Sequence, residues 1–178
     1  NYLDADSTIT KIGLLMPYYL LSNDTMFNND TLDISNRYYT KSEAALSFHI
    51  GVELALDSLR RKGKKIVLYT FDTNQESIEV NKIISSNQLA HMDIIIGPMY
   101  SKYFQMVCEK YGNDSSKRII SPLSRNNQGI TKFPSVYQIA LTYKTQLDIL
   151  IDYLIQHKLQ ERIIILNDSN ETAFVAYA

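Results

Sequence analysis

The sequence has little of what several large classes of protein depend on. It contains one cysteine, Cys108, in 178 residues, which excludes an internal disulfide and a metal cluster built from cysteines. No apolar run approaches the roughly 20 residues that a membrane-spanning helix needs. The formal net charge is −1, so we expect no long-range attraction to nucleic acid or to an anionic membrane. What remains is an ordinary globular composition, 45% hydrophobic and 21% charged, in a chain long enough to bury a sizeable core.

The signatures of common α/β enzymes are also missing. There is no GxGxxG after the first expected strand, no GxxxxGK[ST] and no GxSxG, so dinucleotide-binding, P-loop and hydrolase classes lose their main support. His49, His91 and His157 share no metal-ligand spacing. Cys108 falls within an apolar helical stripe, which favours a buried, inert thiol over a nucleophile. We therefore expect no enzymatic activity, no cofactor and no metal.

Apolar strands alternate with amphipathic helices along the chain. Strands are predicted at 11–17, 65–72, 93–98, 118–122, 136–141 and 162–166, and helices from Thr40 to the Gly63 stop, over 75–86, from Ser101 to Gly112, and along 147–155. The polar stretch between the first strand and Thr40 has no clear period and is interpreted as a connection. Continuously apolar strands alternating with helices are typical of a parallel sheet covered on both faces. The predicted fold class is a doubly wound α/β fold with a mainly parallel sheet.

Residue types at the expected helix ends allow sharper predictions. Thr40 and Glu43 match a capping box at the start of the first helix, and Gly63 is expected to end it. Thr142 is expected to cap the last helix. Ser101 stands where another helix begins, and for a lone serine the better hypothesis is that it caps its own helix.

Ligands of open parallel sheets bind beyond the carboxyl ends of the strands. The segments there are 17–19, 72–74, 97–101, 121–125 and 138–142. Gly97-Pro98 is expected to turn the backbone away from the sheet, so that the free amides at the start of the next helix attract carboxylates or phosphates. Arg125 in "SPLSR" could pair with a ligand carboxylate, with a solvated loop arginine as an equal alternative. Asp72 is interpreted as forming an Asx turn and not a metal site.

Five segments occur together in a recognisable order: "KIGLLMPYY", "SFHIGVELALDSL", "LYTFDT", "MDIIIGPMYS" and "IISPLS". On these residues the chain resembles the type I periplasmic binding proteins, which include the leucine/isoleucine/valine receptors. It is most similar to the module that follows LysM peptidoglycan-binding repeats in Gram-negative envelope proteins. The resemblance runs from about Lys11 to Leu166. It implies a tail or linker at 1–10, a first lobe at 11–141, and the start of a truncated second lobe at 142–178.

The resemblance implies a non-catalytic, extracytoplasmic solute-binding or sensory module. Its location would be the periplasm or the outer-membrane-associated envelope, with any signal peptide outside this sequence. Ser101 and Ser124 match the small hydroxyl residues of the family's ligand site, and a tyrosine near the first strand end has counterparts in Tyr18 and Tyr19. The residues expected to contact ligand are Tyr18, Tyr19, Tyr100, Ser101, Ser121, Ser124, Arg125 and Gln138.

The ligand and partners stay open between alternatives. Tyr100, Lys102, Leu123 and Arg125 depart from the pattern of the amino acid receptors, so the ligand is expected to be either amino acid-like or anionic. The alternative function is an envelope interaction or structural module, associated with peptidoglycan, that keeps the fold without a small-molecule ligand. Its partners would be peptidoglycan or an envelope protein reached through flanking domains, or a second copy in a dimer; nucleic acid is not expected.

Overall fold

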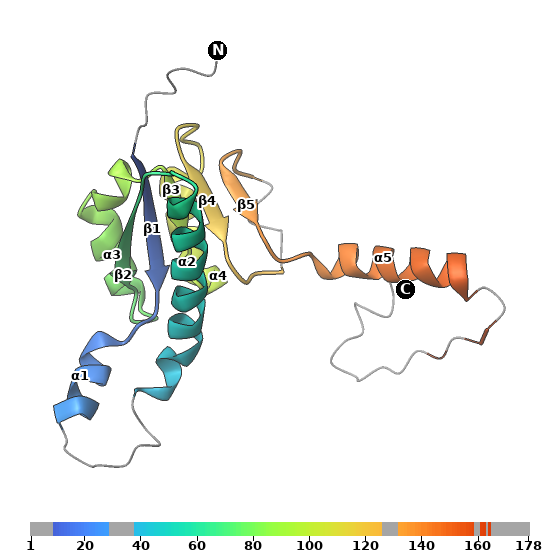
Figure 1. Cartoon of the computed structure of the whole chain (residues 1–178), viewed down its shortest axis with the longest axis horizontal. Helices are drawn as coiled ribbons and strands as arrows, with labels where there is room; N and C mark the ends of the chain where they lie inside the picture. Colours follow the sequence, from blue (N-terminus) through green and yellow to red (C-terminus); the bar gives the residue numbers. More distant parts are fainter. Residues whose placement is uncertain (1–8, 29–37, 126–131, 159–160, 163, 165–178) are drawn as a thin grey trace.

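The computed structural model describes residues 9–28, 38–125, 132–158, 161–162 and 164. A five-stranded sheet forms its body, and all four strand pairs are parallel, in the order β2-β1-β3-β4-β5 (Figure 1). The strands are β1 (Thr10–Met16), β2 (Ile66–Asp72), β3 (Ile94–Ile96), β4 (Arg118–Ser121) and β5 (Val136–Gln138). The helices are α1 (Leu20–Asn28), α2 (Glu43–Arg61), α3 (Ser77–Ser85), α4 (Ser101–Tyr111) and α5 (Tyr143–His157), with short 3-10 turns at Thr40–Ser42 and Gln88–His91.

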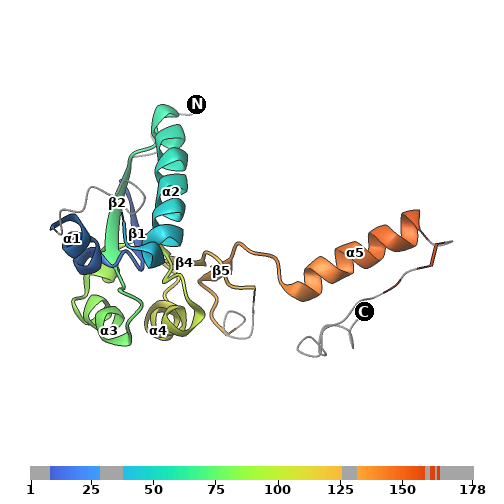
Figure 2. The same cartoon turned by 90° about the horizontal axis from the view of Figure 1, so that it is seen from below.

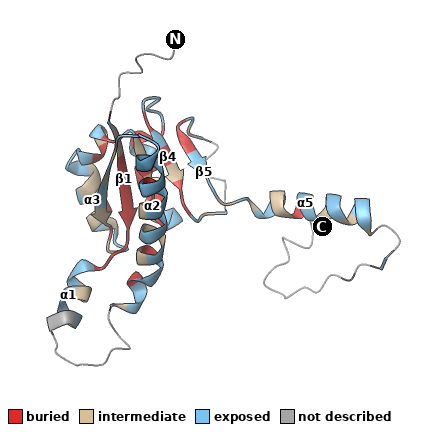
Figure 3. Ribbon diagram, in the orientation of Figure 1, coloured by how far each residue is buried: buried red, intermediate tan, exposed pale blue. Residues whose placement is uncertain are grey.

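Helices cover both faces of the sheet, as Figure 2 shows, with α2 on one side and α3 and α4 on the other. The pleat of β1 explains how one strand serves both layers, because successive side chains point to opposite faces. Leu14 and Met16 pack in the core beneath α2, whereas Leu15 packs in the larger core beneath α3 and α4. Burial is concentrated along β1 (Figure 3). The predicted α/β fold is therefore confirmed.

Helix α5 leaves this body and extends away from the sheet (Figure 1). Its start was predicted correctly, because the Thr142 hydroxyl accepts a hydrogen bond from the Thr145 amide at 3.1 Å. Several of its apolar side chains are exposed, among them Ile149, Leu150, Tyr153 and Ile155. The strand expected at 162–166 lies almost wholly outside the described residues.

Two expectations near the start of the chain were wrong. The polar stretch after β1 contains a helix, α1, although its side chains show no helical period. The capping box at Thr40 does not form, because Thr40 lies in a 3-10 turn and α2 begins at Glu43 without a side-chain cap. The hydroxyl of Ser42 instead donates to the Tyr39 carbonyl at 2.6 Å. Local turn geometry has replaced the cap that the sequence spacing suggested.

Gly97 ends β3 in a conformation that a side chain would disturb. Its φ is +92°, and a Cβ atom there would collide with the carbonyl oxygen of Leu15 on the neighbouring strand. The backbone leaves the sheet at this point and reaches the start of α4, as the Gly-Pro pair predicted. Gly51 on α2 differs, since a Cβ there would meet nothing within 4 Å.

These two glycines make a matched pair of substitutions. Gly97→Ala should lower the free energy of unfolding by at least about 1–2 kcal/mol, because the left-handed backbone alone costs that much for a residue with a Cβ. Gly51→Ala should raise it by up to about 1 kcal/mol, since alanine is the better helix former. Urea unfolding of both variants measures the difference. Equal effects would contradict the close approach at β3.

Cys108 lies on the buried face of α4 with 1% of its surface exposed. Burial, with a smaller effect of the nearby Glu109 charge, raises the pKa of its thiol to about 12. The thiolate is therefore disfavoured in the folded protein, and the expectation that this thiol is buried is confirmed.

The raised pKa has a consequence at alkaline pH. The unfolded thiol ionises near pH 9 while the folded thiol stays protonated, so the stabilising contribution is complete below pH 9 and is lost as the pH rises toward 12. Between pH 8 and pH 10, the free energy of unfolding should fall by about 1.4 kcal/mol more in the wild type than in Cys108→Ala. Urea unfolding at both pH values tests this, and equal losses in the two proteins would contradict it.

Candidate functional site

The parallel register brings the predicted ligand-binding segments to one edge of the sheet. Met16 lies opposite Asp72, Ile96 opposite Ile120, and Ser121 opposite Gln138, so the carboxyl ends of the strands lie side by side. Backbone hydrogen bonds extend this alignment past the strands: Thr73 N–H donates to the Met16 carbonyl at 3.0 Å. We call this part of the molecule the carboxyl edge.

The Asp72 carboxylate organises the side of the carboxyl edge formed by β1 and β2. One oxygen accepts from the amides of Tyr18 at 2.9 Å, Tyr19 at 3.2 Å and Asn74 at 2.8 Å, and the other accepts from Leu20 at 2.8 Å. Three of these amides lead into α1, so Asp72 caps that helix from a different strand. The bond to Asn74 is the Asx turn that the sequence predicted.

The two tyrosines after β1 diverge from this point. Tyr18 has 8% of its surface exposed and packs in the core beneath α2, where its hydroxyl lies 2.7 Å from His49 Nδ1. Tyr19, held at φ +53°, has its hydroxyl bonded to the side-chain oxygen of Gln75. Of the predicted pair, Tyr19 alone joins the other candidate residues, through its proximity to Tyr100.

Gln75 is the centre of a tyrosine cluster that the sequence did not reveal. Tyr103 on α4 donates its hydroxyl to the Gln75 carbonyl at 2.5 Å, and Tyr39 meets Tyr19 edge to face, with ring centroids 5.3 Å apart. Burial, followed by the nearby phenol of Tyr100, raises the pKa of Tyr19. The backbone of Gln75 is left-handed, with φ +53°, and such conformations of non-glycine residues concentrate at functional sites.

Ser101 and Ser124 are brought together across two strand ends. The Ser101 hydroxyl donates to the Ser124 hydroxyl at 3.2 Å. The expectation that Ser101 caps α4 is wrong, because Tyr100 occupies the cap position and no side chain supplies a cap bond. The first residue of α4 therefore directs its hydroxyl to the next loop along the carboxyl edge.

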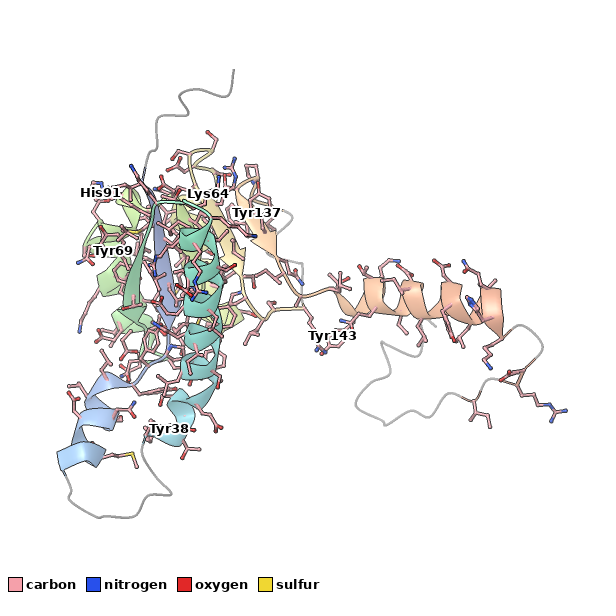
Figure 4. The ribbon with its side chains drawn as sticks, in the orientation of Figure 1. Tyr38, Lys64, Tyr69, His91, Tyr137 and Tyr143 are labelled. Carbon is pink, nitrogen blue, oxygen red and sulfur yellow. The ribbon has the colours of Figure 1, made fainter. Side chains whose placement is uncertain are left out.

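The remaining candidates have different surroundings. Arg125 lies over the ring of Tyr143 at 5.4 Å, where the chain approaches α5, and Figure 4 marks Tyr143 at that helix start. Gln138 donates to the Ala140 carbonyl at 2.7 Å, and Ser121 is buried. Tyr100 is 39% exposed. Hence Tyr100, Ser101 and Arg125 present accessible groups, while Ser121, Tyr18 and Tyr19, the last also 8% exposed, belong to the interior.

Two kinds of functional element are absent from the described residues. In that part of the chain no group of three or more His, Cys, Asp or Glu side chains could hold a metal ion. Nor does any helix there have the length and apolar character needed to cross a membrane.

The chain has the fold of the type I periplasmic binding proteins, the class to which its structural neighbours belong. An ABC transporter substrate-binding protein from Desulfitobacterium hafniense, in complex with Leu, matches with a TM-score of 0.58 and 18% identity over 96% of this chain and 46% of that one. A solute-binding protein of an ABC transporter from Rhodopseudomonas palustris BisB5, in complex with 3,4-dihydroxybenzoic acid, matches with a TM-score of 0.57 and 11% identity over 84% and 37%.

LpoA from Haemophilus influenzae matches with a TM-score of 0.50 and 14% identity over 98% of this chain and 28% of that one. The chain thus spans less than half the length of each of these proteins. No family model matches the sequence, and no curated protein is similar to it. At these identities the likeness establishes the fold, and several neighbours with that fold are solute-binding proteins.

Removing the Asp72 carboxylate should destabilise the protein more than removing a surface carboxylate would, because Asp72 holds the carboxyl edge together. Asp72→Ala deprives four backbone amides of their acceptor, so the free energy of unfolding should fall by at least about 2 kcal/mol. Asp57, paired with Arg61 on the exposed side of α2, is the matched control, and Asp57→Ala should change stability by about 0.5 kcal/mol or less. Urea unfolding compares them. Similar small effects would contradict the capping role.

Proposed function

We propose that this chain is the ligand-holding first lobe of a non-catalytic solute-binding or sensory protein. Residues 142–178 then open a second lobe that closes over the carboxyl edge. The observation that carries the proposal is the pair of hydroxyls, Ser101 and Ser124, held 3.2 Å apart on adjacent strand ends. In an open parallel sheet this is the edge at which ligands bind.

The ligand class proposed is a small organic acid. Arg125 is exposed and carries a guanidinium that can bind a carboxylate through two parallel hydrogen bonds. The amides at the start of α4 add a second attraction for an anion. Leu and 3,4-dihydroxybenzoic acid, the ligands of the two solute-binding neighbours, both carry a carboxylate.

The tyrosine cluster favours an acid with an aromatic or branched apolar body. Tyr19 and Tyr103 bond to Gln75, Tyr39 packs against Tyr19, and Tyr100 lies near Tyr19. Aromatic rings supply a large apolar contact area with little loss of rotamer freedom. A protein of this kind would act in the periplasm or cell envelope, where solute-binding proteins receive their ligands.

A thermal-shift screen of the full-length protein, carrying both lobes, tests the proposal. The panel pairs leucine, phenylalanine, benzoate and 3,4-dihydroxybenzoate with their uncharged amides. One acid at about 100 times its dissociation constant should stabilise the protein by roughly 2.7 kcal/mol, a shift of several degrees. Its amide should produce a much smaller shift.

Variants then locate the binding. Ser101→Ala should weaken the affinity about 2- to 10-fold, as expected for one lost hydrogen bond, and Arg125→Gln should weaken it more, because a charged bond is lost. Ser58→Ala on the exposed surface of α2 is the control and should leave the affinity unchanged. The proposal would be refuted if no acid shifted the melting temperature, or if Arg125→Gln left the affinity unchanged.

The exposed residues of the carboxyl edge favour the second candidate, an envelope interaction module. Tyr100 and Leu123 are 39% and 51% exposed, and tyrosine is a common anchor of protein interfaces. Such a module, with peptidoglycan or an envelope protein as its partner, would give no shift with any acid in the panel. It would instead lose its partner when Tyr100 is replaced by alanine.

A further inference from the structure

A cavity of about 550 Å³ lies on the α2 side of the sheet, beside the edge strand β2, and it borders the carboxyl edge at Tyr18 and Asp72. Leu20, Leu46, Ile50 and the ring of Tyr38 supply apolar surface, and Figure 4 marks Tyr38 beside the beginning of α2. Ser101, Ser124 and Arg125 are not among its lining residues. A cavity of this size and largely apolar character can hold a small organic molecule.

The formal charges lining the cavity are acidic. They belong to Glu43, in the first turn of α2, and Asp72, and among the described residues neither lysine nor arginine lines the cavity. The oxygens of Asp72 already accept bonds from four backbone amides. Glu43 is exposed and makes no ion pair or side-chain hydrogen bond among the described residues. Glu43 is therefore the carboxylate that a cationic ligand would meet.

Tyr18 and His49 give the cavity a polar contact. The Tyr18 hydroxyl lies 2.7 Å from His49 Nδ1, and His49 Nε2 lies 3.8 Å from a Glu53 oxygen. Burial, together with the charges of Asp72 and Glu53, raises the pKa of Tyr18. The phenol thus remains neutral, and the surrounding carboxylates disfavour an anionic ligand on this side of the sheet.

We propose that this cavity is a second binding site, for a small apolar amine. The hydrophobic body lies against Leu46 and Ile50, and the ammonium group pairs with Glu43. The exposed ring of Tyr38 adds a face on which a cation is stabilised. The site does not depend on the organic-acid site at the carboxyl edge, because the two ligands would carry opposite charges and contact different residues.

The test is an NMR titration of the full chain with three probes of one shape: 2-phenylethylamine, 2-phenylethanol and 3-phenylpropionate. The amine should give saturable shifts of the Ile50 and Leu46 methyl signals. It should bind about 1.5- to 5-fold more tightly than the alcohol, the gain expected of one exposed ion pair, and the propionate should bind least. Glu43→Gln should reduce the amine's affinity to that of the alcohol.

Glu109→Gln on α4 is the matched control, because Glu109 is an exposed acid on the opposite face of the sheet. It should preserve the preference for the amine. Glu43→Lys provides a second variant and should reverse the preference toward the propionate. The proposal is overturned if the amine gives no saturable shift at Ile50 and Leu46. It is also overturned if Glu43→Gln keeps the preference, or if Arg125→Gln removes it, which would assign the amine to the carboxyl edge.

Discussion

The arrangement of the carboxyl edge depends on one partly buried interaction, the acceptance of four backbone amides by Asp72. Asp72 is the last residue of β2, and three of its donors follow β1. A carboxylate is suited to this position because its two oxygens offer about four acceptor sites. The interaction fixes where α1 begins, and it fixes the direction in which the chain leaves the central strand.

Directly after β1, two consecutive tyrosines point to different parts of the molecule. Tyr18 goes to the α2 side, where it meets His49, and Tyr19 goes to the tyrosine cluster around Gln75. Tyr19 has a left-handed backbone, with φ +53°, so the chain no longer continues as a strand where the two side chains diverge. The tyrosine cluster and the acidic cavity thus share one structural support, Asp72, while differing in chemistry.

Periodicity and special residue types explain how much of this the sequence could predict. Five strands, the helices α2 to α5, the turn at Gly97 and the cap at Thr142 follow from apolar spacing and from residues with few conformational alternatives. Helix α1 could not be predicted, because its N-terminal amides are satisfied by Asp72, about 50 residues away, and its own side chains show no apolar face. The capping box at Thr40 failed for the converse reason: a local turn competed with it.

The candidate site also contains some residues that the sequence could predict and others that it could not. The serines and Arg125 could be found because the strand ends are predictable, and parallel register brings strand ends together whatever the side chains. Gln75 and Tyr103 could not, because their contact joins a loop to a helix and rests on a left-handed backbone that no local pattern requires. A ligand is harder to predict than the fold, because the neighbours share this architecture while only 11–18% of their residues are identical to those of this chain. Under the proposed function, specificity would come from exposed side chains on this shared framework, here the phenol of Tyr100, the Ser101 hydroxyl and the guanidinium of Arg125.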